Sequence, residues 1–211
     1  MEYRCVATSV EGFIQQLAVA YITHGYWFYV AGEIPPDKEP TAVDAKLIEQ
    51  YGIAISKWAR CRRKKQGLAN MQYLRHERFF VLLATKGRQE FFERERASLR
   101  DVRRVPIKFA GFSISCRKGN DGQWHPSVRL GQGRHSGIKA LLVENGLRRH
   151  EHAMVAELGT SYLSLFAPVQ RQCRETWNAM NRARKRAGLS VLVLEPATLK
   201  RRIIRPFATP R

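Results

Sequence analysis

Cationic side chains are concentrated at two places in the chain. Between Lys57 and Lys65, six of nine residues are Lys or Arg, and residues 171–211 hold eleven such residues against two acidic ones. Lys and Arg supply many of the contacts that proteins make to phosphate oxygens. Both segments therefore predict binding to phosphate groups.

The whole chain carries the same bias. It has 37 Lys and Arg against 18 Asp and Glu in 211 residues, a formal net charge of +19. Such a charge costs self-repulsion in the folded state and attracts polyanions, of which nucleic acid is the commonest. No apolar run approaches the roughly 18 residues that cross a bilayer. We therefore expect DNA or RNA as the partner and no membrane, and the oligomeric state stays open.

Residues suited to catalysis are scattered along the sequence. His150 and His152 could share one metal only on a strand, where they would point the same way, and their segment has the pattern of a helix. Tyr162 would be the accompanying nucleophile. We assign no catalytic residue and expect no metal and no cofactor. A metal-dependent nuclease or nickase stays open as an alternative, because its carboxylates can be dispersed; the unassigned ones are Asp44, Glu77, Glu90 and Asp101.

Two helices are expected to position the first basic segment. We place them at 41–51 and 56–66, because Ser56 is a good N-cap and Gly52 and Gly67 suit the left-handed residue that ends a helix. The short connection between them requires steep packing. The apolar residues at the offsets that this packing needs are Leu47, Tyr51, Ile53, Trp58 and Cys61.

Burial of Trp58 and Cys61 would turn the intervening cations outward, so that Lys57, Arg60 and Lys64 form one exposed stripe. This segment resembles the helix-turn-helix of DNA-binding proteins, whose second helix enters the major groove. Ile48 departs from that pattern, because the family usually has a small residue there. The resemblance implies groove contacts from the stripe and phosphate contacts from Arg62, Arg63 and Lys65.

The wider order of elements resembles a winged helix. A helix at 9–24, a strand at 26–34, the helix pair and a hairpin at 69–84 follow one another as in that family. The resemblance implies that Arg75 and Arg78 lie on a wing that touches the backbone or the minor groove. We therefore take 1–86 as a winged-helix-like basic domain. The alternative is a helical hairpin with a solvated basic face inside a larger sheet.

The remainder, 87–211, is expected to form a second small unit, which gives an α+β fold overall; a single domain is the alternative. We expect strands at 105–116, 124–130 and 189–194 and helices at 137–159 and 168–187. The last helix has an apolar inner face made of Val169, Cys173, Trp177 and Met180. The cations at its end and beyond are candidate phosphate ligands: Arg182, Arg184, Lys185, Arg186, Lys200, Arg201 and Arg202.

An RNA-binding component of a ribonucleoprotein is a second alternative. Gly111 and Phe112 resemble part of the central strand of the RNA-recognition motif, which stacks aromatic side chains on bases. The strand at 26–34 is also rich in aromatic residues. We favour core packing for the aromatic residues of both segments, and DNA as the partner.

Cysteine usage indicates the compartment. Cys5, Cys61, Cys116 and Cys173 form no closely spaced pair, which predicts buried free thiols in a reducing environment. The N-terminus lacks the charge-then-apolar order of a signal peptide. We therefore expect a cytoplasmic or nucleoid-associated protein, and a small basic protein of this kind suits replication, transposition or regulation of a mobile element.

Overall fold

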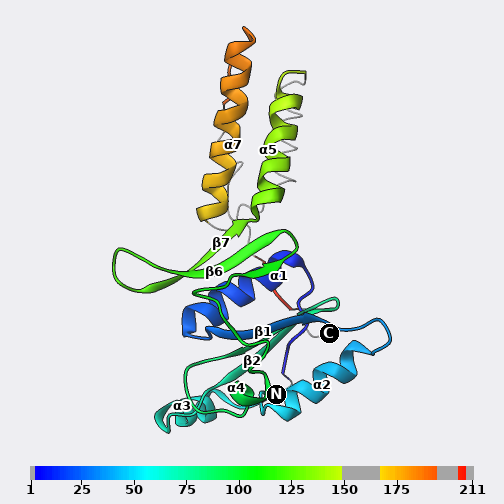
Figure 1. Ribbon diagram of the computed structural model, residues 1–211, viewed down its shortest axis with the longest axis vertical. Coiled ribbons are helices and arrows are strands. Elements are labelled where there is room, and N and C mark those ends of the chain that lie inside the picture. The colour runs from blue at the N-terminus through cyan, green and yellow to red at the C-terminus, as the bar shows by residue number, and fades with distance from the viewer. Residues whose placement is uncertain (1–2, 149–166, 194–203, 208–211) are drawn as a thin grey trace. The chain divides into compact units, whose positions relative to one another are not determined.

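The computed structural model describes residues 3–148, 167–193 and 204–207 (Figure 1). Contacts divide the chain into two units: Met1–Ile107, Ile114–Pro126 and Ile204–Arg211 form the first, and Lys108–Ser113 and Ser127–Ile203 the second. The boundary predicted at residue 86 falls inside the first unit. The reason is that Phe91 is fully buried in its core and β4 (Arg100–Asp101) pairs with its sheet. Both units mix helix and strand, which confirms the α+β class.

An antiparallel sheet forms the centre of the first unit. Its strands are β1 (Phe28–Glu33), β2 (Met71–His76), β3 (Phe79–Ala84) and β4, in the order β2-β3-β1-β4. Leu82 is the residue opposite both Val30 and Tyr73 in the register. The β2–β3 hairpin turns at Glu77, which has a φ of 51°. The predicted hairpin is therefore confirmed, with its turn at the predicted place.

Helices cover both faces of this sheet (Figure 1). On one face lies the helical segment 10–24, which consists of α1 (Val10–Gln15), a π-helical stretch η1 (Gln16–Tyr21) and a 3-10 turn η2 (Ile22–His24). Its Phe13 is fully buried and packs edge-on against Phe79 of β3, with ring centroids 5.8 Å apart. On the other face lie α2 (Pro40–Gln50), α3 (Lys57–Lys65) and α4 (Phe91–Arg94). Burial on both sides explains why residues 81–84 are continuously apolar.

The α2–α3 connection has the predicted helix ends. Gly52 has a φ of 56° and Gly67 a φ of 70°, the left-handed conformation that glycine adopts without strain. The Ser56 hydroxyl accepts a hydrogen bond from the Ala59 amide at 3.2 Å and so caps α3. Between the helices, Tyr51 and Ile53 enter the core. The helix pair is therefore confirmed as two elements with the expected bounds.

Residues 105–116 differ from the single long strand that we predicted. They form β5 (Ile107–Phe109) and β6 (Phe112–Lys118), which together with β7 (Trp124–Leu130) make a three-stranded sheet. Between β5 and β6, Ala110 and Gly111 both have positive φ, 46° and 77°. Two consecutive residues of positive φ make the tight turn whose twist suits a hairpin. The apolar run therefore folds back on itself.

Two helices dominate the second unit, α5 (Gln132–Gly146) and α7 (Ala167–Arg186). The predicted inner face of α7 is confirmed, because Val169, Cys173, Trp177 and Met180 are all buried. The predicted helix at 137–159 begins earlier, and its residues after 148 lie outside the described part of the chain.

Residues 189–193 do not form the predicted strand. Their backbone is held by α7 instead: Asn181 donates from Nδ2 to the Leu192 carbonyl at 2.8 Å and accepts from the Leu192 amide at 2.9 Å. Trp177 Nε1 donates to the same carbonyl at 3.1 Å. These side chains take the place of a neighbouring strand, since they satisfy the backbone groups that a sheet would pair.

Candidate nucleic-acid interface

The helix α3 presents outward the face that we predicted to be buried. Trp58 is 78 % exposed and Cys61 is exposed, whereas Arg60 and Arg63 are half-buried. The prediction of Trp58 and Cys61 as anchors is therefore wrong, and Arg60 does not belong to the outward stripe. No residue of α3 is fully buried.

Two arginines attach α3 to the rest of the first unit. Arg60 Nη2 donates to the Ile53 carbonyl at 3.2 Å, before the helix, and Arg63 Nη2 donates to the Ala69 carbonyl at 2.9 Å, after it. Asn70 Nδ2 donates to the Arg60 carbonyl at 3.0 Å. Long arginine stems can cover apolar surface while their charged ends reach polar groups, so they replace apolar anchors here. Two of the six cations therefore serve the fold.

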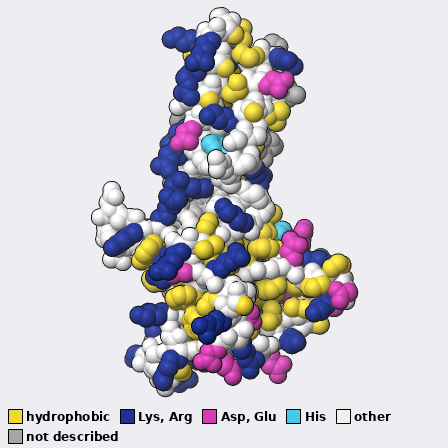
Figure 2. Space-filling view, viewed as in Figure 1, with side chains coloured by type: hydrophobic (Ala, Val, Ile, Leu, Met, Phe, Trp, Pro, Cys, Tyr) yellow, Lys and Arg dark blue, Asp and Glu magenta, His cyan; other side chains and the backbone are white. Residues whose placement is uncertain are grey.

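Two of the other four cations of α3, Arg62 and Lys65, share the exposed face with Trp58. Successive helical residues are rotated by about 100°, so the face opposite Arg60 and Arg63 is centred near Cys61, Lys65 and Trp58. Arg62 lies within this face, whereas Lys57 and Lys64 form a neighbouring stripe, about 100–120° round the helix from Trp58. All four cations are exposed, and none forms an ion pair with any residue that the structure describes. Figure 2 shows Lys and Arg side chains gathered over α3.

Arg88 extends this cationic surface beyond the end of α3. Its amide donates to the Gly67 carbonyl at 3.0 Å, and its carbonyl accepts from the Ala69 amide at 3.0 Å, so its backbone lies beside the residues that follow the helix. Its side chain is exposed. Sequence reasoning missed Arg88, because nothing in the residue pattern predicts that 87–88 lies against 67–69.

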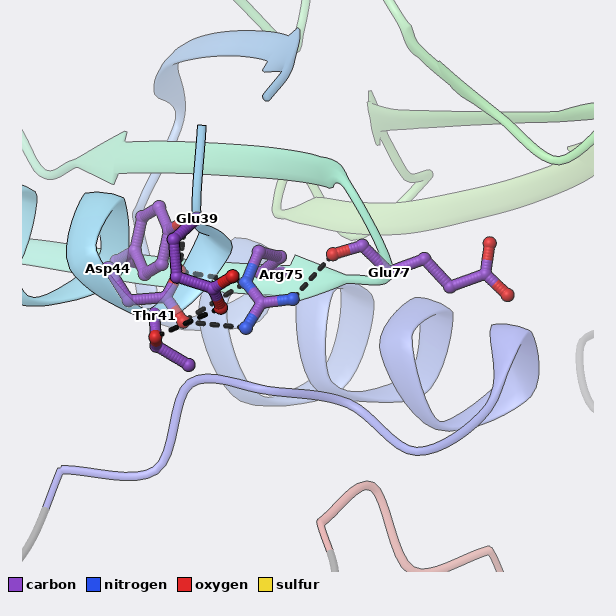
Figure 3. Close-up of polar contacts among 6 residues, drawn as sticks. Glu39, Thr41, Asp44, Arg75 and Glu77 are labelled. Atoms are coloured by element: carbon purple, nitrogen blue, oxygen red, sulfur yellow. Dashed lines mark hydrogen bonds and ion pairs between the residues drawn. The ribbon is translucent and has the colours of Figure 1, made fainter. Parts of the chain in front are cut away.

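Arg75 is removed from the candidate site, because it lies in the core (Figure 3). It is 6 % exposed, and its guanidinium forms two short contacts with Asp44 of α2, Nε to Oδ1 at 2.8 Å and Nη2 to Oδ2 at 2.7 Å. Its Nη1 donates to the Glu77 carbonyl at 2.5 Å, and Tyr73 donates its hydroxyl to Asp44 Oδ1 at 2.7 Å. Hydrogen bonding to Asp44 raises the pKa of Arg75 above its ordinary value. The Arg75 guanidinium is therefore engaged by the Asp44 carboxylate and the Glu77 carbonyl inside the first unit.

Arg78 lies at the hairpin turn as predicted, but its guanidinium is occupied. Its Nη1 donates to the carbonyls of Ile34 at 3.2 Å and Pro35 at 2.6 Å, and its Nη2 donates to that of Pro36 at 3.3 Å. Arg78 thus fixes the turn-rich connection between β1 and α2, and its charge is only half-exposed.

The cations of α7 also include one that is bonded within the fold and others that are exposed. Arg184 is 8 % exposed and donates from Nε to the Ser190 carbonyl at 2.7 Å and from Nη1 to the Gly146 carbonyl, so it joins α5 to α7 and is not a surface ligand. Arg182, Lys185 and Arg186 are exposed. Figure 2 shows cations along the α7 side of the helix pair. Lys200, Arg201 and Arg202 lie outside the described residues.

The acidic residues that we left unassigned are mostly engaged in ion pairs. Asp44 pairs with Arg75, Glu90 with Arg94 at 3.0 Å, and Asp101 with Arg103 at 2.6 Å. Burial raises the pKa of Asp101, but hydrogen bonds from Arg103 and its charge outweigh burial and leave that pKa below its ordinary value. Within the described residues, no group of three His, Cys, Asp or Glu side chains could hold a metal ion. The further candidates His150, His152 and Tyr162 lie outside those residues.

Most aromatic side chains of the predicted strands are buried. Tyr29 and Phe112 are each 2 % exposed. Trp27 and Trp124 are half-buried, their ring centroids are 6.3 Å apart, and the guanidinium carbon of Arg103 lies 4.3 Å and 5.4 Å from them. These rings therefore have partners within the first unit.

A comparison of the chain with protein-family models, with curated protein sequences and with solved structures finds no match. In the part of the chain that the structure describes, no helix is both long enough and apolar enough to cross a membrane. The site that remains is the exposed face of α3 with Arg88 beside it, and separately the exposed end of α7.

Proposed function

We propose that the chain binds nucleic acid through phosphate contacts made by the exposed face of α3. The observation that carries the proposal is that Lys57, Arg62, Lys64 and Lys65 are exposed and without carboxylate partners among the described residues. No acidic residue lies on α3 to offset them. Four exposed cations on one short helix offer a polyanion several contacts, each of which releases counterions from its backbone.

The helix dipole does not account for this charge. Cations in the last turn are stabilised by the partial negative charge of a helix C-terminus, which covers Arg62, Lys64 and Lys65. Lys57 is the first residue of α3, where the dipole disfavours a positive charge. Attraction of a negatively charged ligand accounts for the positive charge at Lys57 as well as for the other three cations.

The attachment of α3 supports the same proposal. Arg60 and Arg63 hold the helix at both ends, and Ser56 caps its first turn. A helix fixed in this way presents its free cations with little loss of conformational freedom on binding. In this proposal α3 is still the helix that contacts the nucleic acid, as the helix-turn-helix resemblance implies. The contacting face is the one that carries Trp58, and the face with Arg60 and Arg63 is turned toward the fold. DNA is the form we propose first.

The exposed end of α7 is proposed as a second, separate phosphate-binding surface. Arg182, Lys185 and Arg186 gather there, while Arg184 is committed to the fold. Because the helix dipole favours cations at this end, the three charges support binding less strongly than those of α3 do. We therefore expect their removal to weaken binding less than removal of the α3 cations.

The test is fluorescence anisotropy with the full chain at low salt, using labelled DNA and RNA oligonucleotides. A variant with Lys57, Arg62, Lys64 and Lys65 changed to alanine is compared with a control of the same charge change at other exposed cations of the first unit. The control positions are Arg4, Lys38, Lys46 and Arg96. We expect the α3 variant to lose most of its affinity and the control to lose little. Equal losses would show attraction by net charge alone, and absence of binding by the wild type would overturn the proposal.

A further inference from the structure

We propose, on the basis of the function proposed above, that the bound nucleic acid supplies an unpaired base which stacks on Trp58. The chain should then prefer single-stranded nucleic acid over duplex. Two features of the first unit lead to this inference: the exposure of the indole and its position beside Arg62 and Lys65.

The exposure of Trp58 is unusual among the large apolar side chains of this chain. At 78 %, it is the most exposed of those in the described residues, and the others on the surface are Val and Leu. The indole makes no hydrogen bond and no ring contact with any described residue. Most of the indole is therefore available to an aromatic ligand.

The surroundings of Trp58 favour a nucleic-acid base over an apolar protein side chain. Arg62 lies four residues later on the helix and Lys65 seven residues later, on the same face. Side chains four apart on a helix are neighbours, about 5–6 Å apart at Cβ. A base stacked on the indole would therefore have a flanking phosphate within reach of Arg62 and Lys65. A protein hot spot would need a water-excluding ring of near-neutral contacts, whereas the residues of α3 that share this face are Cys61 and the cations Arg62 and Lys65.

The interior of a duplex satisfies this face poorly. In a duplex the bases are paired and stacked on one another, so their faces are not available to Trp58. In a single strand every base has a free π-face, and stacking on an aromatic side chain strengthens binding in a sequence-tolerant way. A stack of this kind is worth about 5- to 150-fold in affinity when it is tested by alanine substitution.

The experiment measures the binding of a labelled 12-nucleotide oligo-dT, an oligo-rU of the same length and a 12-base-pair duplex to the full chain. Four proteins are compared: the wild type, Trp58→Ala, Trp58→Leu as an apolar control, and Trp58→Phe as the conservative variant. We expect Trp58→Ala and Trp58→Leu to bind the single strands about 5- to 150-fold more weakly. Trp58→Phe should retain most of the affinity, and duplex binding should change little in all three variants.

Two further readouts separate stacking from a structural role. Because Trp58→Ala removes no phosphate contact, the slope of log K against log salt should stay at its wild-type value. Saturation with oligo-dT should quench intrinsic fluorescence in the wild type and clearly less in Trp58→Phe, although Trp27, Trp124 and Trp177 are present in both. Melting temperatures should be unchanged, since the ring is exposed.

The outcomes distinguish this inference from the function on which it rests. Wild-type affinity of Trp58→Ala for oligo-dT, together with weak binding by the four-cation variant, would overturn the stack and leave phosphate binding standing. Absence of binding to every oligonucleotide would overturn both. A labelled polyglutamate peptide is the remaining probe. If the peptide binds as tightly as oligo-dT, and if its affinity falls as much in Trp58→Ala, the surface recognises acidic protein and the inference is refuted.

Discussion

Removal of the Asp44 carboxylate should strongly destabilise the first unit. The side chains of Asp44 and Arg75 are each 8 % exposed and lie 2.7 Å apart. In Asp44→Ala the guanidinium stays buried, and the Glu77 carbonyl is the acceptor that it keeps among the described residues. The Tyr73 hydroxyl loses its Asp44 acceptor as well. A buried charge left without its partner costs about 3–5 kcal/mol, so this is the expected fall in the free energy of unfolding.

The same contacts predict how the loss can be recovered. If Asp44, Arg75 and Tyr73 are changed together to Leu, Met and Phe, no buried charge or unsatisfied hydroxyl remains. Apolar replacement of a complete buried ion pair is often neutral or stabilising by about 1–4 kcal/mol. The triple variant should therefore be more stable than Asp44→Ala, although it differs more from the wild type.

The assay is urea unfolding of the full chain, followed by far-UV circular dichroism and by hydrogen exchange of the β2 amides, which report on the first unit. The matched control is Glu90→Ala, which breaks the exposed ion pair with Arg94, whose side chain is 49 % exposed against 62 % for Glu90. Exposed pairs contribute about 0–1 kcal/mol. If Asp44→Ala costs no more than Glu90→Ala, or if the triple variant is the least stable of all, our account of the buried pair is refuted.

Three further predictions concern thiols, helix packing and pH. In the native chain only Cys61 should react rapidly with a thiol reagent such as DTNB, because the other three thiols are buried. All four thiols should react in denaturant. Rapid reaction of a second thiol in native buffer would contradict this prediction. Gly146→Ala should destabilise the α5–α7 pair by about 1–3 kcal/mol, because a Cβ there would lie 2.4 Å from Cγ of Met180, and Met180→Ala should relieve part of that loss in thermal melts. Burial raises the pKa of Cys5 to about 12 from its ordinary 9.0, and burial with a hydrogen bond to Glu95 raises the pKa of Tyr51 to about 12 from 10.0. Both pKa values are higher in the folded than in the unfolded state, so the stability that the two protonated groups contribute is complete below about pH 9 and is lost as the pH rises toward 12. Melting temperatures should therefore fall over that range. The fall should be less steep in Cys5→Ala.

Much of the fold could be predicted from local patterns. Glycines with positive φ at 52 and 67 and the Ser56 cap set the ends of α2 and α3, as the sequence indicated. The apolar spacing of Val169, Cys173, Trp177 and Met180 correctly placed the inner face of α7. These signals are short-ranged, so they act in the same way wherever the segment lies in the tertiary structure.

The orientation of α3 was not determined by such a signal. Trp58 and Cys61 are the residues of α3 that are large or apolar enough to suggest an inner face. The aliphatic stems of Arg60 and Arg63 can cover the edge of a core equally well. What decides between the two is the position of the Ile53 and Ala69 carbonyls, which accept from Arg60 and Arg63. That position depends on tertiary structure, which residue spacing alone does not give.

The burial of Arg75, by contrast, has a signal in the sequence. Arg75 follows Met71 and Tyr73 at intervals of two, which places it on the core face of β2. Asp44 stands three, four and seven residues before the apolar Leu47, Ile48 and Tyr51, which places it on the inner face of α2. One acid and one base on two facing apolar surfaces indicate a buried ion pair, because neither charge is tolerated there alone.

The most direct test of the central claim is the salt dependence of oligonucleotide binding. In the wild type and in the variant that lacks Lys57, Arg62, Lys64 and Lys65, log K is measured for oligo-dT against log salt concentration. If each cation contacts one phosphate of a single strand, the slope should become shallower by about 3 in the variant. Parallel lines for the two proteins would show that the exposed face of α3 makes no phosphate contacts and would contradict the account.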